Sequence, residues 1–250
     1  MRSLTILGFN FKDSSYDEII HLIDGKITSK EVITFLNVIP HIINEAFKKS
    51  SLKINLKKLS LIFADGVGVY LGSKILYGKN GFKYKITGTD LYYKVLFYAE
   101  KNQKKIFFFG GGDEAASLLE DSLKSRFPEL IITGIRKRET IFTDSAVEQI
   151  KASNSDILFL GLGSPYQEEW LARYSAYVNI PAQIAMGSGI EFLSGNYSRA
   201  PKIFQSIGLE WFYRFLQEPL RLWKRYFLGN PLFLYRILLQ KVHNIKLQKK

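Results

Sequence analysis

Seven short segments of this chain are apolar along almost their whole length, and stretches with helical periodicity separate them. A strand with one face in water alternates apolar and polar residues, whereas a strand covered on both faces is apolar throughout. The pattern therefore predicts a Rossmann-like, three-layer α/β domain with a mainly parallel sheet. The strands are expected at 4–9, 32–36, 59–64, 105–110, 130–135, 156–163 and 183–187, and the helices near 15–27, 38–50, 67–77, 90–102, 113–126, 144–153 and 166–178.

The strand pattern stops at about residue 198, and only helical periodicity follows. The sequence thus predicts an α/β catalytic domain over 1–197 and a helical appendage over 198–250, in which Pro219 should kink or divide a helix. The appendage holds 11 Lys and Arg against two Glu, a net charge of +9, which leaves +3 of the total +12 for the rest of the chain.

Charge and composition limit the partners of the chain. A basic tail points to an anionic partner, and nucleic acid, anionic lipid and a phosphorylated substrate all fit. The chain has no cysteine, which excludes disulfides, zinc–thiolate sites and thiol nucleophiles and fits a reducing compartment. Its N-terminus does not resemble a secretory signal, and no window of about 18 apolar residues predicts a transmembrane helix.

Two predicted strands end in residues that are common at ligand sites. Ligands of open α/β sheets bind beyond the carboxyl ends of the strands. Asp65 follows the strand at 59–64, where it is either a turn-forming residue or a general base. Gly110 and Gly111 end the strand at 105–110, where glycines serve equally for close strand–helix packing or for a nucleotide that approaches backbone amides.

The segment GLGSPYQEEW follows the sixth predicted strand and carries several polar groups. Gly163 and Pro165 end the strand and open a helix whose first turn holds Gln167 and Glu168. An acidic residue there can simply complement the helix dipole. Gln167 is expected at the same edge of the sheet as Asp65.

The segment KITGTD at 85–90 places a cation and two threonines before an apolar helical stretch. Thr89 is expected to cap that helix, because a threonine hydroxyl accepts hydrogen bonds from the backbone amides of the first turn.

The appendage carries an arginine-rich helical face. At 100° per residue, Arg214, Arg221 and Arg225 fall within about 40° of one another, opposite large apolar residues. A solvated charged face would be the ordinary explanation, yet all three cations are Arg in a chain rich in Lys. Arg suits bidentate binding of phosphate, so these residues fit a diphosphate, and the aromatic side fits an anionic membrane. The lysines expected at that membrane are Lys224, Lys241 and Lys246.

No set of metal ligands is apparent, since the three histidines are far apart in sequence and none has a partner at ligand spacing. No metal is therefore expected.

Seven segments, taken in order, are similar to the WecG/TagA/CpsF family of glycosyltransferases (glycosyltransferase family 26) over essentially the whole chain. In the last segment, RAP, GLEW, YR and EP-R at their spacings are the most specific. The segments are FLNVIPHIINEA, FADGVGVYLG, KITGTDL, FFFGGGDEAA, FPELIITG, DILFLGLGSPYQEEWL and AMGSGIEFLSGNYSRAPKIFQSIGLEWFYRFLQEPLRLWKRY.

The resemblance implies an inverting, metal-independent glycosyltransferase that needs no cofactor and works in cell-surface polysaccharide synthesis, such as that of teichoic acid or exopolysaccharide. It implies a UDP-sugar donor, with N-acetylmannosamine or a related hexose, and a polyprenyl-diphosphate-linked sugar acceptor. It also implies a cytoplasmic enzyme, peripheral on the inner face of the membrane, that touches an anionic surface through its appendage. Nucleic acid is not expected as a partner, and a homo-oligomer is left open.

The resemblance further assigns roles to residues. Asp65 would be the general base that deprotonates the acceptor hydroxyl. Arg214, Arg221 and Arg225 would neutralise the leaving nucleoside diphosphate, a task that arginines must perform where no metal does. The other substrate-binding residues would be Asn37, Lys85, Thr89, Gly110, Gly111, Gly163, Pro165, Gln167, Glu168 and Glu191.

The chain departs from the family pattern at a few positions. Phe35 stands where Thr is frequent, Lys85 where Arg is usual, and Glu191 where Asp is usual. RKRETIF follows FPELIITG where the family has a segment with Gly and Tyr or Phe. These departures bear on the donor sugar and the acceptor more than on the class of reaction.

Two other functions stay open from the residues alone. A nucleotide-binding oxidoreductase would use the same fold, but it needs a G-x-G-x-x-G fingerprint that the chain lacks. A non-enzymatic protein that binds nucleic acid or membrane would use the basic aromatic tail. Such a protein would have no need of Asp65, Gln167 or the glycine-rich strand ends.

Overall fold

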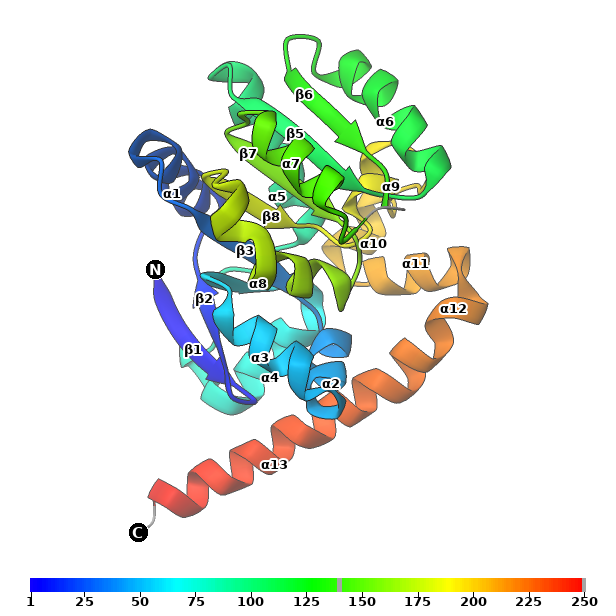
Figure 1. Cartoon of the computed structure of the whole chain (residues 1–250). Coiled ribbons are helices and arrows are strands. Elements are labelled where there is room, and N and C mark those ends of the chain that lie inside the picture. Colours follow the sequence, from blue (N-terminus) through cyan, green and yellow to red (C-terminus); the bar gives the residue numbers. More distant parts are fainter. Residues whose placement is uncertain (139–140, 249–250) are drawn as a thin grey trace.

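A computed structural model describes residues 1–138 and 141–248, with side chains described as far as residue 245. The sequence-based expectations for Lys246, and for two residues of RKRETIF, lie outside this part. The eight strands are β1 (Arg2–Ile6), β2 (Phe9–Asp13), β3 (Ile33–Val38), β4 (Leu61–Ala64), β5 (Lys105–Gly110), β6 (Ile131–Arg136), β7 (Ile157–Gly161) and β8 (Ala182–Ala185). They form one sheet in the order β1-β2-β4-β3-β8-β7-β5-β6 (Figure 1). Only β1 runs antiparallel to its neighbour, so the predicted mainly parallel sheet is confirmed.

Helices cover both faces of the sheet. One face carries α1 (Tyr16–Ser29), α5 (Gly88–Lys101), α6 (Asp113–Arg126) and α9 (Gly189–Leu193). The other carries α2 (Pro40–Lys48), α3 (Ser50–Lys58), α4 (Gly66–Tyr77), α7 (Asp144–Ala152) and α8 (Tyr166–Val178). In β5, Ile106 and Phe108 pack toward the first layer and Phe107 and Phe109 toward the second, and all four are buried. Burial on both faces is the reason that the strand has no polar residue after the exposed Lys105.

The segment at 4–9 holds the end of β1, a turn at Leu7 and Gly8, and the start of β2, so the prediction of a single strand there was wrong. Leu7 and Gly8 both have positive φ, +51° and +82°, which is typical of a two-residue hairpin turn. A leucine in this conformation gives no sequence signal. The helix predicted at 38–50 likewise ends at Lys48, and extended backbone at Lys49 separates it from α3.

Helices alone make up the described chain from Lys202. They are α10 (Lys202–Ser206), α11 (Glu210–Gln217), α12 (Pro219–Trp223), the π-helical turn η3 (Lys224–Gly229) and α13 (Asn230–Gln248). Pro219 begins α12, so the expected division of the helix is confirmed. The domain boundary at 198 stays a prediction.

The last helix is a long rod that runs back beneath the domain toward the N-terminal hairpin (Figure 1). A Cβ atom on Gly72 of α4 would lie 3.1 Å from the Phe233 ring, so the absence of a side chain lets α13 pack closely. Further along, Gln240 accepts a hydrogen bond of 2.8 Å from the backbone N–H of Leu7. These contacts fix the rod to the domain and, with it, the helical turns that precede the rod.

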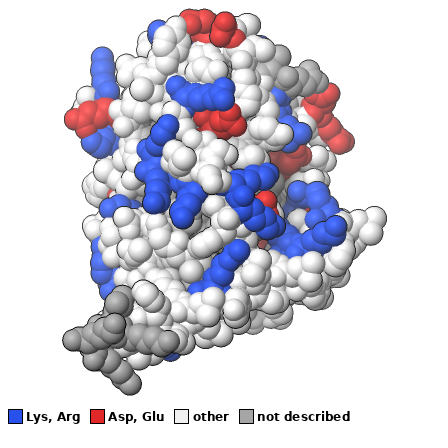
Figure 2. Space-filling model, turned by 60° about the horizontal axis from the view of Figure 1, so that its bottom comes forward, with Lys and Arg blue, Asp and Glu red and all other residues white. Residues whose placement is uncertain are grey.

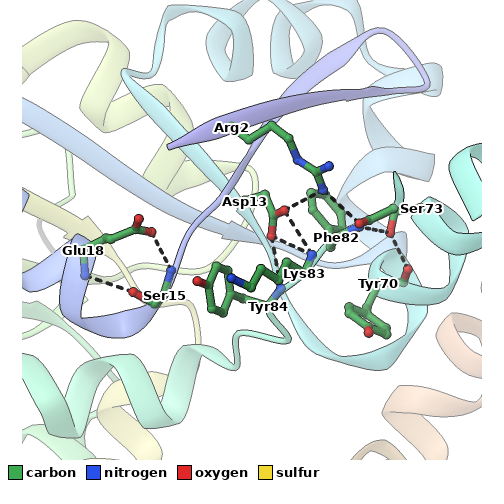
Figure 3. Close-up of polar contacts among 10 residues, drawn as sticks. Arg2, Asp13, Ser15, Glu18, Tyr70, Ser73, Phe82, Lys83 and Tyr84 are labelled. Carbon is green, nitrogen blue, oxygen red and sulfur yellow. Dashed lines mark hydrogen bonds and ion pairs between the residues drawn. The ribbon is translucent and has the colours of Figure 1, made fainter. Parts of the chain in front are cut away.

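A buried carboxylate anchors the loop between α4 and α5 (Figure 3). Asp13, at the end of β2, pairs with Arg2 at 2.7 Å and accepts backbone hydrogen bonds from Lys83 and Tyr84 at 3.0 and 3.1 Å. Buried carboxylates of this kind are stable because their lone pairs are satisfied. The anchored loop leads directly to Ile86 and the start of α5, where the candidate site lies.

Candidate active site

The connections that leave two central strands diverge to opposite faces at the carboxyl edge of the sheet, and this switch point is termed the crevice. After β3 the chain enters α2 on one face, and after the neighbouring β8 it enters α9 on the other. Ligands of α/β sheets bind where neighbouring connections diverge in this way. Asn37 near the end of β3, Asp65 after β4 and Gly187 after β8 all lie at this edge.

Asp65 lies at the junction of β4 and α4. Its Oδ1 accepts a hydrogen bond of 3.0 Å from the backbone N–H of Gly88, and its Oδ2 accepts none within the described residues. Burial raises the pKa of Asp65 to about 6, and the negative charge of Glu210 contributes to the rise. The hydrogen bond from Gly88 and the positive charge of Arg225 oppose it. The group is therefore an anion at neutral pH and a stronger base than an ordinary aspartate.

Asn37 is buried beside Asp65. Its Nδ2 donates to the hydroxyl of Tyr92 at 3.5 Å, while its Oδ1 is buried without a hydrogen-bond partner in the described chain. Gly88 lies against the side chains of Tyr92 and Asn37. A Cβ atom on Gly88 would lie 2.8 Å from the Tyr92 hydroxyl oxygen and 3.0 Å from Asn37 Nδ2. Asn37, Asp65, Gly88 and Tyr92 therefore form one polar cluster at the floor of the crevice.

The start of α5 differs from the sequence-based expectation. The capping residue is Thr87, whose hydroxyl accepts from the Asp90 N–H at 3.3 Å and donates to the Asp90 carboxylate at 2.7 Å. The expectation of Thr89 as the cap was wrong, because α5 already begins at Gly88 and Thr89 lies within its first turn. Lys85 is exposed, with its Nζ near Gly208.

Gln167 and Glu168 lie buried in the first turn of α8. Gln167 Oε1 accepts a hydrogen bond of 2.9 Å from the Gly187 N–H, which places Gln167 at the same edge as Asn37. Burial raises the pKa of Glu168, whose Oε2 has no partner among the described atoms. Gly163 has a φ of +74°, and Pro165 follows a cis peptide bond, so the loop turns sharply into the helix.

The glycine-rich turn after β5 packs closely against its neighbours. A Cβ on Gly110 would lie 2.4 Å from the backbone of Gly161, and one on Gly111 would lie 2.7 Å from Ile190. Glu191 accepts a hydrogen bond of 3.0 Å from the Gly112 N–H, so a carboxylate of the chain itself occupies the first amide of α6. Close packing thus accounts for the first two glycines.

Arg225 is the cation most closely coupled to Asp65. Burial lowers the pKa of Arg225. The charges of Tyr226 and Asp65 oppose this effect, and the charges of Arg221 and Arg214 add to it. The Arg225 guanidinium lies over the Tyr226 ring, 5.4 Å from its centroid, and no carboxylate forms an ion pair with it within the described residues. A half-buried cation without an ion-pair partner fits an anionic ligand.

Glu218 neutralises the other two arginines of the appendage. It accepts from Arg221 at 2.7 and 2.5 Å and from the Tyr197 hydroxyl at 3.1 Å, and it forms an ion pair with Arg214. The Arg214 guanidinium also stacks on the Tyr197 ring at 3.6 Å and is 12% exposed, whereas Arg221 is 56% exposed. The proline and the π-helical turn break the expected common face, so the three arginines gather without sharing one orientation.

Arg199 is a site residue without a role in the sequence-based assignment. It pairs with Asp90 at the start of α5 at 2.7 Å and with Glu210 at the start of α11 at 3.3 Å. Glu210 and Asp90 both raise the pKa of Asp65, and Arg199 pairs with both of these carboxylates. The arginine of the RAP segment was the available signal.

The face beside the C-terminal rod is basic. Figure 2 shows Lys and Arg gathered around a hollow in the middle of this face, with few carboxylates among them. Within residues 1–138 and 141–248, no helix is long and apolar enough to cross a membrane, and no group of three acidic, histidine or cysteine side chains could hold a metal ion.

Comparison with known proteins gives a match over nearly the whole chain. The model of the glycosyl transferase WecG/TagA/CpsF family matches residues 4–247. A Bacillus subtilis (strain 168) protein, N-acetylglucosaminyldiphosphoundecaprenol N-acetyl-beta-D-mannosaminyltransferase, is 29% identical over 230 residues, which cover 90% of this chain and 87% of the relative. A Staphylococcus aureus (strain MW2) protein of the same name is 27% identical over 238 residues, or 93% and 91% of the two chains.

Proposed function

Because the chain belongs to the WecG/TagA/CpsF family of glycosyl transferases, we propose that it transfers a sugar from a UDP-sugar to a polyprenyl-diphosphate-linked sugar, with inversion and without a metal. The chain is a glycosyltransferase, and its relatives carry names that specify an N-acetylmannosaminyl donor group and an N-acetylglucosaminyl-diphosphoundecaprenol acceptor. The sugar proposed for this chain is N-acetylmannosamine or a related hexose.

The observation that carries the proposal is a carboxylate of raised basicity, Asp65, coupled electrostatically to an arginine, Arg225, that has no ion-pair partner in the described chain. Asp65 keeps Oδ2 without a hydrogen bond within the described chain, and its raised pKa of about 6 makes it a competent proton acceptor. In the proposed step the acceptor hydroxyl loses its proton to Asp65 and its oxygen attacks the anomeric carbon. The bond from that carbon to the diphosphate oxygen breaks, and UDP leaves from the opposite side.

The departing diphosphate needs positive charge, and Arg225 is proposed to supply it first. Arg225 is coupled electrostatically to Asp65 and lacks a carboxylate partner in the described chain. Arg221 is proposed as the second ligand, since it is largely exposed and would reach the diphosphate by leaving Glu218. Fixed cations of this kind stabilise charge that develops in the transition state.

The nucleoside and sugar are proposed to lie along the carboxyl edge of the sheet. Asn37, Gln167 and Glu191 present side-chain polar groups there, and Gly110, Gly111, Gly163 and Pro165 shape the backbone. Lys85, Thr89 and Glu168 are proposed to complete the binding site. Carboxylate and amide side chains are suited to the hydroxyl groups of a ribose or a hexose.

The appendage is proposed to bring the crevice to an anionic membrane surface on the cytoplasmic side. Leu220 is 92% exposed, and Trp223, Phe227 and Leu228 are also exposed on the adjoining turns. Exposed Lys224 and Lys241 would add electrostatic attraction. Apolar side chains flanked by lysines are typical of segments that lie in a membrane interface.

A donor screen tests the proposal. Purified protein would receive UDP-N-acetylmannosamine, UDP-N-acetylglucosamine or UDP-glucose together with a polyprenyl-diphosphate-linked N-acetylglucosamine, and the lipid product would be measured by mass spectrometry. We expect product with one of these donors and none when the acceptor lacks its sugar. Hydride transfer to a nicotinamide cofactor, with no sugar transfer from any donor, would favour the oxidoreductase instead.

A further inference from the structure

Tyr92 lies behind the two polar groups that define the floor of the crevice. Its hydroxyl accepts the Asn37 hydrogen bond at 3.5 Å and packs against Gly88, whose N–H holds Asp65. Tyr92 therefore contacts both the amide of Asn37 and the backbone that orients the carboxylate.

The position of the Tyr92 ring is closely defined. A Cβ on Gly189 would lie 2.8 Å from the ring edge, and the Phe159 ring packs against it edge-on at 6.0 Å between centroids. The Tyr92 side chain is 4% exposed. Burial raises the pKa of its hydroxyl, and the negative charge of Asp65 raises it further. The group therefore stays a neutral hydroxyl that can donate a proton to a hydrogen bond.

The polar pair is incompletely satisfied. Asn37 Oδ1 is buried without a partner, and the Tyr92 hydroxyl donates to no acceptor in the described chain. Replacing Tyr92 with phenylalanine would leave the buried Asn37 Nδ2 without its acceptor and would lower stability. The hydroxyl therefore fixes the Asn37 amide, while Oδ1 of that amide stays without a partner in the described chain.

We propose that Tyr92 is a positioning residue of the transfer reaction: its hydroxyl holds the Asn37 amide so that Oδ1 accepts a hydrogen bond from the substrate beside Asp65. The inference rests on the proposed function, because it needs a substrate in the crevice. It adds a residue that contacts no reacting atom and acts through Asn37.

The test is the variant Tyr92→Phe, with Tyr93→Phe as its matched control. Tyr93 is the next residue of α5, and its hydroxyl accepts from Arg126, outside the crevice. We expect Tyr92→Phe to lower kcat/KM by about 5- to 10-fold, the worth of one hydrogen bond, when it is assayed well below its melting temperature. The melting temperature itself should fall, because Asn37 Nδ2 loses its acceptor. Tyr93→Phe should keep the wild-type kcat/KM.

A double-mutant cycle shows whether Tyr92 acts through Asn37. Asn37→Ala should abolish the effect of the tyrosine hydroxyl, so that adding Tyr92→Phe changes kcat/KM by less than about twofold. Wild-type activity in Tyr92→Phe, an independent effect in the double variant, or a loss of activity that is fully explained by unfolded protein at the assay temperature would each overturn the inference.

The proposed function can fail separately. If the wild-type protein transferred no sugar, both the function and the role of Tyr92 would fall. If the wild type were active, Asp65→Asn inactive and Tyr92→Phe fully active, only the role of Tyr92 would fall.

Discussion

Asp65 Oδ1 and the backbone N–H of Gly88 are joined by a hydrogen bond of 3.0 Å between the end of β4 and the start of α5. The bond occupies one carboxylate oxygen and leaves the other without a hydrogen bond in the described chain. It also stabilises the charged form, which moderates the rise in pKa that burial imposes. The carboxylate thus has a fixed orientation and one oxygen available for a proton.

Removal of the base should stop the reaction without removing the donor site. We expect Asp65→Asn to lower kcat by at least about 10²-fold, since general bases contribute 10² to 10⁴, while the Kd for UDP changes little. Calorimetry gives the Kd and product formation gives kcat. Asp121→Asn, an exposed change on α6, is the control and should be active. Full activity of Asp65→Asn would exclude Asp65 from the mechanism.

The pH dependence should follow Asp65. Because its pKa in the folded protein is raised to about 6, kcat should fall on the acidic side with an apparent pKa near that value. The folded protein holds this proton more tightly than the unfolded chain does, so the group lowers stability as the pH rises from about 4 to about 6. Asp65→Asn should therefore melt above the wild type at pH 7.5 but not at pH 4. A constant difference between the two at both pH values would contradict this assignment.

Arg225 should contribute more to UDP binding than its neighbour Lys224. We expect Arg225→Ala to weaken UDP binding by about tenfold or more, because a buried guanidinium forms strong, charge-assisted hydrogen bonds with a diphosphate. Lys224→Ala, one residue away and exposed over the Trp223 ring, is the matched control. Calorimetric titration with UDP measures both. Equal affinities for the two variants would reassign Arg225 away from the diphosphate.

Glu218 should stabilise the appendage. Glu218→Gln would leave Arg214 without its ionic partner in a largely buried position, at a cost of about 1–3 kcal/mol in the free energy of unfolding. Chemical denaturation measures the change. Glu45→Gln, which removes an ion pair with Lys48 on the surface of α2, should cost less than about 1 kcal/mol. Equal losses in the two variants would show that the Glu218 cluster adds no special stability.

Leu220 should contribute to membrane binding. Leu220→Glu replaces a nearly fully exposed leucine with an anion and should weaken binding to phosphatidylglycerol vesicles by about tenfold or more. Phe97→Glu, an exposed aromatic residue on α5, is the control and should bind as the wild type does. Sedimentation with vesicles gives the bound fraction. The proposed membrane surface would be excluded if the two variants bound equally well.

Metal chelation should leave the rate unchanged. If arginines neutralise the leaving diphosphate, EDTA treatment of enzyme and substrates should alter kcat by less than about twofold, and added Mg²⁺ should not restore any difference. A rate that falls with EDTA and returns with Mg²⁺ would assign the neutralisation to a metal.

The central strands were predictable from sequence because both of their faces are buried. After Lys105, β5 carries only apolar residues and glycine, and this is a strong local signal. The hairpin was not predictable, since Leu7 adopts a conformation that its side chain disfavours. The π-helical turn at Lys224–Gly229 was not predictable either. It changes the angular position of the residues that follow, and no residue type in the segment indicates such a turn.

The candidate site was only partly predictable from sequence. Asp65 and Gln167 follow strands, and strand ends are where sites of this fold lie. Tyr92 belongs to an apolar helical stripe, where an aromatic residue is ordinarily part of the core. The pairing of Glu218 with two arginines depends on how the helix is broken at Pro219, and a regular helical projection does not include such a break.

The hydrogen bond between Leu7 and Gln240 spans 233 positions of the sequence. Contacts of such high separation form late, since closing a long loop costs entropy before the contact returns any free energy. The hairpin precedes Asp65 in the chain and the rod follows Arg225, so docking of the rod brings the segment that carries Arg225 to a domain whose sheet has already formed. Until the rod docks, the apolar surface of α4 that receives Phe233 stays uncovered.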